Sequence, residues 1–149
     1  MPQIRQATID DVPVLVPLVA AYWSFEDITG FDLPRVSAQL ARLLGEPRLG
    51  CGWVALVEGV PVGYLLGVYV FSLEHLGLTA EIDEFFVLRD QRGRGVGVEM
   101  LRIAESEFLR AGCTNVSLQL SRDNDSARAF YQRHGYAERS GYELLDKML

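Results

Sequence analysis

This chain of 149 residues lacks the features of membrane-spanning, secreted and nucleic-acid-binding proteins. No apolar run approaches the ~20 residues that span a bilayer, since the longest, at residues 62–71, is interrupted by Gly63 and Gly67. The N-terminus has no charged leader before an apolar core, as a secretory signal would. The formal net charge of −6 does not favour broad contact with nucleic-acid phosphates. We therefore expect a cytoplasmic protein that binds neither membrane nor nucleic acid.

Cysteine is also scarce. The two residues, Cys51 and Cys113, are far apart and lack the spacing of metal ligands. We expect both to be small buried side chains rather than a disulfide, and we expect no metal.

Two nucleotide-binding motifs are missing as well. A Walker loop needs Gly-Lys followed by Ser or Thr, and the dinucleotide fingerprint G-x-G-x-x-G fails at its sixth position, from Gly93 as from Gly95. ATP and NAD are therefore poor candidates.

The composition is that of an ordinary globular protein, with 49% hydrophobic and 23% charged residues. The length is about that of one domain, and the chain has no internal repeat, low-complexity tract or linker. We predict a single domain over residues 1–149.

Hydrophobic periodicity predicts alternating strands and helices, which indicates an α/β domain. The strands are expected at residues 3–7, 52–58, 62–73, 80–88 and 116–120, with a final strand in the tail from residue 141. The helices are expected from a cap at Asp10 or Asp11 to Tyr22, and at residues 34–44, 95–111 and 124–134.

The stretch EIDEFFVLRDQRGRGVG, residues 81–97, changes character halfway through. Three carboxylates precede a loop in which Arg92 and Arg94 alternate with glycines. A strand, a glycine-rich loop and a helix present backbone N–H groups to an anion, and glycine lets the anion approach closely. The residues alone leave two interpretations open. The loop binds a phosphate or pyrophosphate, or it is a flexible surface loop with solvated arginines.

Two segments carry a family resemblance. Arg92-Gly93-Arg94-Gly95-Val96-Gly97, preceded by Phe85-Phe86-Val87, closely resembles the acetyl-CoA-binding segment of the GNAT superfamily of N-acetyltransferases. Residues 124–135, NDSARAFYQRHG, resemble its second signature, N-x-x-A-x-x-x-Y-x-x-x-G. One predicted helix and one strand separate them, as that fold requires, and the similarity covers essentially the whole chain. It implies a mixed, mostly antiparallel sheet of about six to seven strands flanked by helices.

The resemblance implies acetyl-CoA as co-substrate and assigns its contacts by position. The backbone of Phe86 and Val87 would pair with the pantetheine arm, admitted between splayed strands. Asn124 would hydrogen-bond that arm or cap its helix. The pyrophosphate would be held by the amides of Arg92, Gly93, Arg94, Gly95, Val96 and Gly97. Tyr131 would direct its hydroxyl at the thioester sulfur and protonate the leaving thiolate.

The chemistry also needs a base, because amines with pKa about 10 are protonated at neutral pH. In a regular strand, Glu81 and Asp83 share one face and Glu84 lies on the other. Similarity to the spermidine/spermine acetyltransferase-like branch favours Asp83, and similarity to histone acetyltransferases favours Glu81. Glu84 and a water chain remain alternatives, and a bulge would change which side chains converge. The N–H of Val87 is the family-like donor to the oxyanion.

Aromatic and acidic residues lie where this superfamily often builds its acceptor wall. Tyr22, Trp23 and Glu26 are the candidates there, together with Glu84. Carboxylates beside aromatics suit a cationic amine, although core packing is an alternative for Tyr22 and Trp23.

We therefore predict acetyl transfer to the primary amine of a small cationic or amino-acid-like molecule. A protein N-terminus or lysine is the second possibility, and a non-catalytic acyl-CoA-binding regulatory module is the rival of another class. The apolar tail, residues 144–149, and the habit of the family favour a homodimer.

Overall fold

The computed structural model describes residues 1–149, which form two compact units, Met1–Leu118 and Gln119–Leu149. The first unit holds the strands β1 (Gln3–Gln6), β2 (Gly50–Val57), β3 (Val60–Ser72), β4 (Gly77–Val87) and β5 (Val116–Leu118). It also holds the helices α1 (Val12–Phe25), α2 (Leu33–Gly45) and α3 (Val96–Arg110), and the short 3₁₀ turns η1 (Ile9–Asp11) and η2 (Arg89–Gln91). The second unit holds α4 (Asp125–Arg133).

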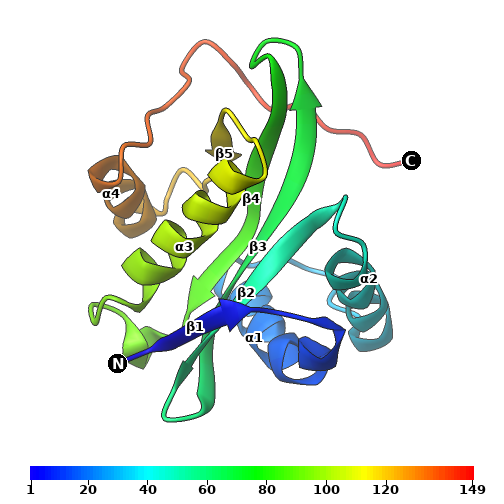
Figure 1. The fold of residues 1–149 in the computed structure, drawn as a ribbon, viewed down its shortest axis with the longest axis vertical. Helices are drawn as coiled ribbons and strands as arrows, with labels where there is room; N and C mark the ends of the chain where they lie inside the picture. Colours follow the sequence, from blue (N-terminus) through cyan, green and yellow to red (C-terminus); the bar gives the residue numbers. More distant parts are fainter. The chain divides into compact units, whose positions relative to one another are not determined.

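The five strands form one sheet in the order β1-β2-β3-β4-β5 (Figure 1). Three neighbouring pairs are antiparallel, and only β4 and β5 are parallel. This confirms the predicted α/β architecture with a mixed, mostly antiparallel sheet. The prediction of six to seven strands is wrong by at least one, because the sheet has five.

The difference lies in the C-terminal tail, which was predicted to end as a strand. Residues 141–149 contain no strand, and the side chains of Leu145 and Met148 are almost fully exposed. A strand exists only where its backbone groups pair with a neighbour, and the sheet has no strand beyond β5. The alternation that favours a strand is also broken by the adjacent Leu144 and Leu145.

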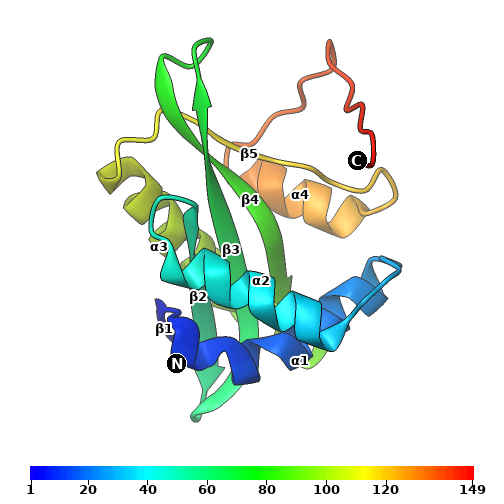
Figure 2. The same cartoon turned by 90° about the vertical axis from the view of Figure 1, so that its right-hand side faces the viewer.

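Helices cover both faces of the sheet in the first unit. Figures 1 and 2 show α1 and α2 on one face and α3 on the other. Between the α1/α2 pair and the sheet lies a core that includes Leu15, Val19, Leu40, Tyr64 and Leu66. The exposed side of α2 includes Arg35, Gln39 and Arg42, as expected of an amphipathic helix on a sheet, while Leu33 in its first turn is also exposed.

On the opposite face, Phe108 of α3 packs between two strands. Its ring contacts Trp53 of β2 and Tyr69 of β3 at centroid distances of 5.5 and 6.3 Å, both edge to face. The close approach depends on Gly67 of β3, where an added Cβ would lie 2.5 Å from Cζ of Phe108. A side chain at this position would push α3 away from the sheet.

The structure also shows the environment of the two cysteines and the length of the helices. Cys51 and Cys113 are free thiols, and both are buried, as expected of small apolar side chains. None of the helices is long and apolar enough to cross a membrane.

Candidate active site

A β-bulge interrupts β4 at the acidic stretch. Leu66 of β3 pairs with Glu84, while the next residue, Gly67, pairs with Ile82. Asp83 is therefore an extra residue with no partner on β3, which is the definition of a bulge.

The bulge changes which side chains share a face. Cross-strand partners point to the same face of a sheet, so Glu84 lies on the face of Leu66 and Glu81 on that of Val68. Leu66 and Val68 are two residues apart and both face α1 and α2. The alternation expected of a regular strand, with Glu84 opposite Glu81 and Asp83, therefore does not apply here, because the extra residue shifts it by one. A bulge was the named exception to that expectation.

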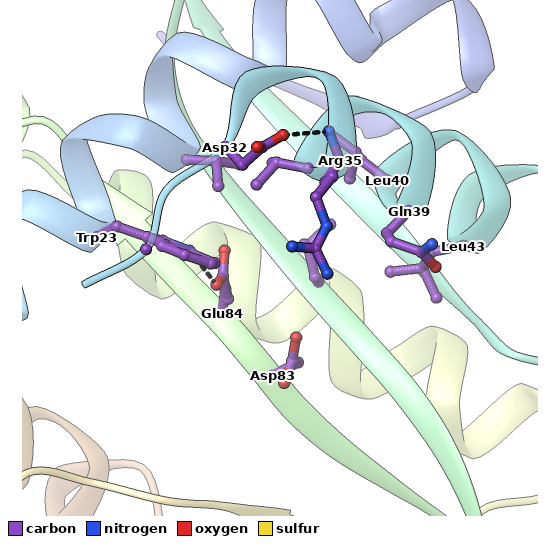
Figure 3. A pocket seen from close by; sticks show the side chains of 12 residues that line it. Trp23, Asp32, Arg35, Gln39, Leu40, Leu43, Asp83 and Glu84 are labelled. Carbon is purple, nitrogen blue, oxygen red and sulfur yellow. Dashed lines mark hydrogen bonds between the residues drawn. The ribbon is translucent and has the colours of Figure 1, made fainter. Parts of the chain in front are cut away.

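A hollow of about 400 Å³ lies on this face, between β4 and the helices α1 and α2 (Figure 3). Asp83 and Glu84, although adjacent in sequence, both line it. The other lining residues are Val19 and Trp23 of α1, Gly30 and Asp32 of the following loop, Arg35, Val36, Gln39, Leu40 and Leu43 of α2, and Leu66 of β3.

Glu84 is held at both carboxylate oxygens. Trp23 donates its indole N–H to Oε2 at 2.8 Å, and Tyr64 donates its hydroxyl to Oε1 at 2.8 Å. Trp23 is itself packed edge to face against Phe31, with centroids 5.6 Å apart. Burial raises the pKa of Glu84, and the two hydrogen bonds oppose part of that rise. The arrangement fixes Glu84 in one orientation at the wall of the hollow.

Asp83 lies in a different environment. Burial by the walls of the hollow raises the pKa of its carboxyl, and no hydrogen bond or neighbouring charge opposes the rise. Its side chain is nevertheless still exposed to the hollow. Glu81 shares the face but does not line the hollow. A carboxylate with a raised pKa that remains accessible is suited to accept a proton near neutral pH.

The residues at α1 that were expected to face an acceptor lie in different places. Trp23 lines the hollow, whereas Tyr22 and Glu26 do not. Tyr22 instead packs in the core, with its ring 5.9 Å from that of Phe86 and 6.4 Å from that of Tyr64. Burial raises the pKa of the Tyr22 hydroxyl to about 12, with Glu26 as a further cause.

Sequence reasoning missed the wall that α2 contributes. Asp32 caps this helix, since its Oδ1 accepts the backbone N–H of Arg35 at 2.9 Å. Arg35 and Gln39 then point into the hollow one turn apart (Figure 3). The two residues are four positions apart, and each is followed by an apolar residue, Val36 or Leu40. This pattern places both polar side chains at the border of the buried face of α2, and it could have identified them from the sequence.

The edge of β4 that faces β5 is paired over only part of its length. β5 pairs with Ala80, Glu81 and Ile82, and no strand pairs this edge beyond them. The N–H of Leu88 donates to Val62 on the β3 side at 2.8 Å, so by alternation the N–H of Val87 points to the β5 side. The same alternation turns the backbone groups of Phe86 toward β3. Of the two residues predicted to pair with an extended ligand, Val87 therefore has the suitable orientation.

Arg92 is anchored rather than mobile, contrary to the expectation for this loop. Its Nε donates to the carbonyl oxygen of Val87 at 2.8 Å. Its guanidinium lies over the rings of Phe25 and Phe86, 4.8 and 5.3 Å from their centroids. These contacts tie the loop to β4 and to the end of α1.

The glycine-rich loop leads directly into α3. Gly95 is the N-cap residue and has φ +84°, a conformation that glycine adopts without strain. The first helical bond runs from the N–H of Glu99 to Gly95 at 3.0 Å. The amides of Val96, Gly97 and Val98 therefore have no acceptor within the helix. Together with the exposed Arg94, they form a site suited to an anion.

The second unit holds the other predicted residues. Asn124 caps α4, since its Oδ1 accepts the N–H of Ala127 at 3.1 Å. The ring of Tyr131 packs edge to face against Phe130 and Tyr136, each at a centroid distance of 5.3 Å. The roles of Asn124 and Tyr131 toward a ligand stay predictions. No group of three or more His, Cys, Asp or Glu side chains is placed to hold a metal ion.

Three features are consistent with the family resemblance: a β4 edge that is only partly paired, backbone N–H groups without helical acceptors at the start of α3, and a hollow that Asp83 and Glu84 line. A family model described as "Acetyltransferase (GNAT) family" matches residues 17–136. The chain belongs to the GNAT family. This acetyltransferase is 34% identical over 136 residues to the aminoalkylphosphonate N-acetyltransferase of Salmonella typhimurium, a match that covers 91% of this chain and 85% of that protein.

Two more similarities agree with this assignment. An uncharacterized N-acetyltransferase of Methanocaldococcus jannaschii is 33% identical over 90 residues. The match covers 60% of this chain and 54% of that protein. The crystal structure of an integron cassette protein from the mobile metagenome of Cole Harbour Salt Marsh superposes with a TM-score of 0.87. It is 31% identical, and the match covers 99% of this chain and 90% of that one. The protein is an N-acetyltransferase.

Proposed function

We propose that this N-acetyltransferase transfers the acetyl group of acetyl-CoA directly to the primary amine of a small cationic or amino-acid-like molecule. The observation that carries the proposal is the bulge in β4. It directs Asp83 and Glu84 into one hollow, at the point where the strand loses its neighbour β5. The amine would thus be deprotonated beside the edge along which an extended acyl donor can bind.

Asp83 is the general base in this mechanism. The attacking amine must lose a proton, and a carboxylate whose pKa is raised accepts one more readily near neutral pH. Burial raises the pKa of Asp83 without opposition, whereas both oxygens of Glu84 already accept hydrogen bonds. Glu84 and Trp23 instead bind the acceptor. Glu81, which lies outside the hollow, is a weaker candidate for the base.

Val87 stabilises the oxyanion that forms when the amine attacks the thioester carbonyl. Its N–H points to the unpaired edge of β4, and its carbonyl is fixed by Arg92. A donor held rigidly before the reaction contributes more than one that must reorient. Phe86 contributes through its ring, which supports the guanidinium of Arg92. Tyr131 protonates the thiolate as coenzyme A leaves, and Asn124 hydrogen-bonds the pantetheine arm.

The pyrophosphate of acetyl-CoA binds at the start of α3. The amides of Gly93, Arg94, Gly95, Val96 and Gly97 form the cradle, and Arg94 adds positive charge. The backbone N–H of Arg92 already donates to the carbonyl oxygen of Arg89 at 3.3 Å, so Arg92 supports the cradle through its side chain, which holds the loop in place.

Two observations favour a small acceptor over a protein. The hollow has a volume of about 400 Å³, which lies near the lower end of small-molecule sites. The Salmonella relative, with which this chain shares 34% identity, acts by its name on aminoalkylphosphonates.

The cytoplasmic location and the homodimer also stay predictions. The exposed apolar side chains of Leu144, Leu145 and Met148 support self-association, since such surface is normally covered. Sedimentation equilibrium of the full chain checks the dimer, and a monomer at all concentrations contradicts it.

Thiol release from acetyl-CoA, followed across a panel of amines with mass detection of the product, tests the proposed reaction. We expect amine-dependent release and a product heavier by one acetyl group. If coenzyme A raises the melting temperature while no amine increases release, the protein binds acyl-CoA without catalysing transfer.

A further inference from the structure

The hollow carries two carboxylates on the β4 wall and charges of both signs on the α2 wall, where Arg35 lies near the capping residue Asp32. Asp83 and Glu84 lie on the β4 side, and Arg35 reaches in from α2 (Figure 3). The two walls belong to elements separated by about fifty residues of sequence, so the fold alone brings these charges together.

Arg35 is available to a ligand. Its backbone N–H donates to Oδ1 of the capping residue Asp32, but its guanidinium forms no ion pair with a carboxylate of the hollow. The contrast with Arg42 of the same helix is direct, since Arg42 pairs with Glu46 at 3.1 Å. A charge that the protein leaves unpaired inside a binding site is normally matched by the ligand.

The carboxylates have their own partners or their own task. Both oxygens of Glu84 already accept hydrogen bonds, from Trp23 and Tyr64. Oδ1 of Asp32 accepts the backbone N–H of Arg35. Asp83, which lines the hollow, is the proposed base. An acceptor with only positive groups would satisfy these carboxylates but place like charge against Arg35. An acceptor with one amine and one anionic group matches both walls.

We propose that the acceptor is a small amine bearing an anionic group, and that Arg35 binds this group while the amine lies at Asp83 and Glu84. The inference rests on the proposed function and narrows its substrate class to amino acids and aminoalkylphosphonates. Guanidinium suits either anion, because its planar N–H groups bind a carboxylate or a phosphonate in a bidentate manner.

A panel of four amines of similar length tests the charge requirement. It contains 2-aminoethylphosphonate, β-alanine, ethanolamine and 1,4-diaminobutane. We expect kcat/KM to be highest for one of the two anionic amines, and the comparison between those two distinguishes phosphonate from carboxylate. A preference for diaminobutane overturns the proposal while the acetyltransferase function stands.

Substitutions of Arg35 test the residue itself. Arg35→Ala should lower kcat/KM for the anionic amines by about 10- to 100-fold, the effect of losing a charge-assisted hydrogen bond, and change it little for ethanolamine. Arg35→Lys should retain part of the preference. Arg35→Glu should invert it toward diaminobutane. Arg42→Ala, on the same helix but outside the hollow, is the matched control and should leave all four rates unchanged.

The possible failures are distinguishable. An equal loss for all four amines in Arg35→Ala assigns Arg35 a structural role and overturns the proposal, as does an unchanged preference. If no amine is acetylated by the wild-type protein although acetyl-CoA binds, the proposed function fails, and the substrate class fails with it. Melting temperatures with and without coenzyme A show whether each variant is folded.

Discussion

The indole N–H of Trp23 donates to Oε2 of Glu84 at 2.8 Å, and so joins the end of α1 to the bulge of β4 across 61 residues of sequence. Tyr64 holds the other oxygen. The carboxylate of Glu84 is thereby fixed, and the adjacent Asp83 is the proposed base.

Replacing Trp23 by Phe keeps an aromatic ring but removes the donor. We expect the pKa of Glu84 to rise further, because one of the two bonds that lower it is lost. At pH 7 the free energy of unfolding should fall by about 1–2 kcal/mol, the cost of leaving a partly buried acceptor unpaired. Urea denaturation at pH 7 and pH 4 measures the effect, which should be smaller at pH 4, where Glu84 is protonated. Tyr64→Phe should behave alike, and a loss independent of pH would contradict this account.

The pH profile of turnover should report the ionisation of Asp83. Burial raises its pKa in the folded protein, so the base form, and with it kcat, is lost as the pH falls through a pKa that lies above the ordinary value of Asp. Asp83→Asn should remove this limb and lower kcat by about 10²- to 10⁴-fold. The control Asp10→Asn changes an exposed carboxylate of η1 and should leave the profile intact. Persistence of the limb in Asp83→Asn would assign the base to another group.

Gly95→Ala should weaken the binding of acetyl-CoA. The position has φ +84° and no atom within 4 Å of an added Cβ, so the cost is conformational, about 1 kcal/mol. Relaxation of this strain moves the amides that begin α3. Gly59→Ala is the matched control, since Gly59 has φ +78° and equally open surroundings in the β2–β3 hairpin. Both variants should lose similar stability, but only Gly95→Ala should raise the dissociation constant for coenzyme A in calorimetry. Equal affinities would place the phosphates elsewhere.

Tyr131→Phe should lower kcat far more than it lowers the affinity for acetyl-CoA. The substitution removes the hydroxyl proposed to protonate the thiolate and keeps the ring that packs against Phe130 and Tyr136. Steady-state kinetics and calorimetry measure the two quantities separately. Tyr142→Phe, which removes an exposed hydroxyl of the same unit, is the control. An unchanged kcat in Tyr131→Phe would remove this hydroxyl from the mechanism.

Much of the fold was predictable because its signals are local. Helical spacing and caps placed α1, α2, α3 and α4 within a few residues of their observed bounds. The turn at Glu58 and Gly59, both with positive φ, was visible as a break between two apolar runs. The prediction of a strand in the C-terminal tail was wrong, because a strand depends on a partner strand that its own residues do not specify.

The candidate site likewise has features that could be predicted from the sequence and features that could not. The glycine-rich loop before α3 was recognisable in the sequence, because Gly93 and Gly95, with φ +74° and +84°, adopt a conformation that favours glycine. The anchoring of Arg92 on Phe25 and Phe86 was not recognisable, because it joins three separate elements. Arg35 was missed because nothing near it in sequence shows that α2 faces the acidic strand.

The sequence by itself determined the order of elements, the class of the fold and the family, since these follow from periodicity and from two contiguous motifs. Only the tertiary structure decided which carboxylates converge and what faces them. The pairing of β3 with β4 creates the bulge that turns both Asp83 and Glu84 into the hollow, and packing of α2 brings Arg35 opposite. Register and packing are settled by contacts between distant residues, so no local pattern contains them.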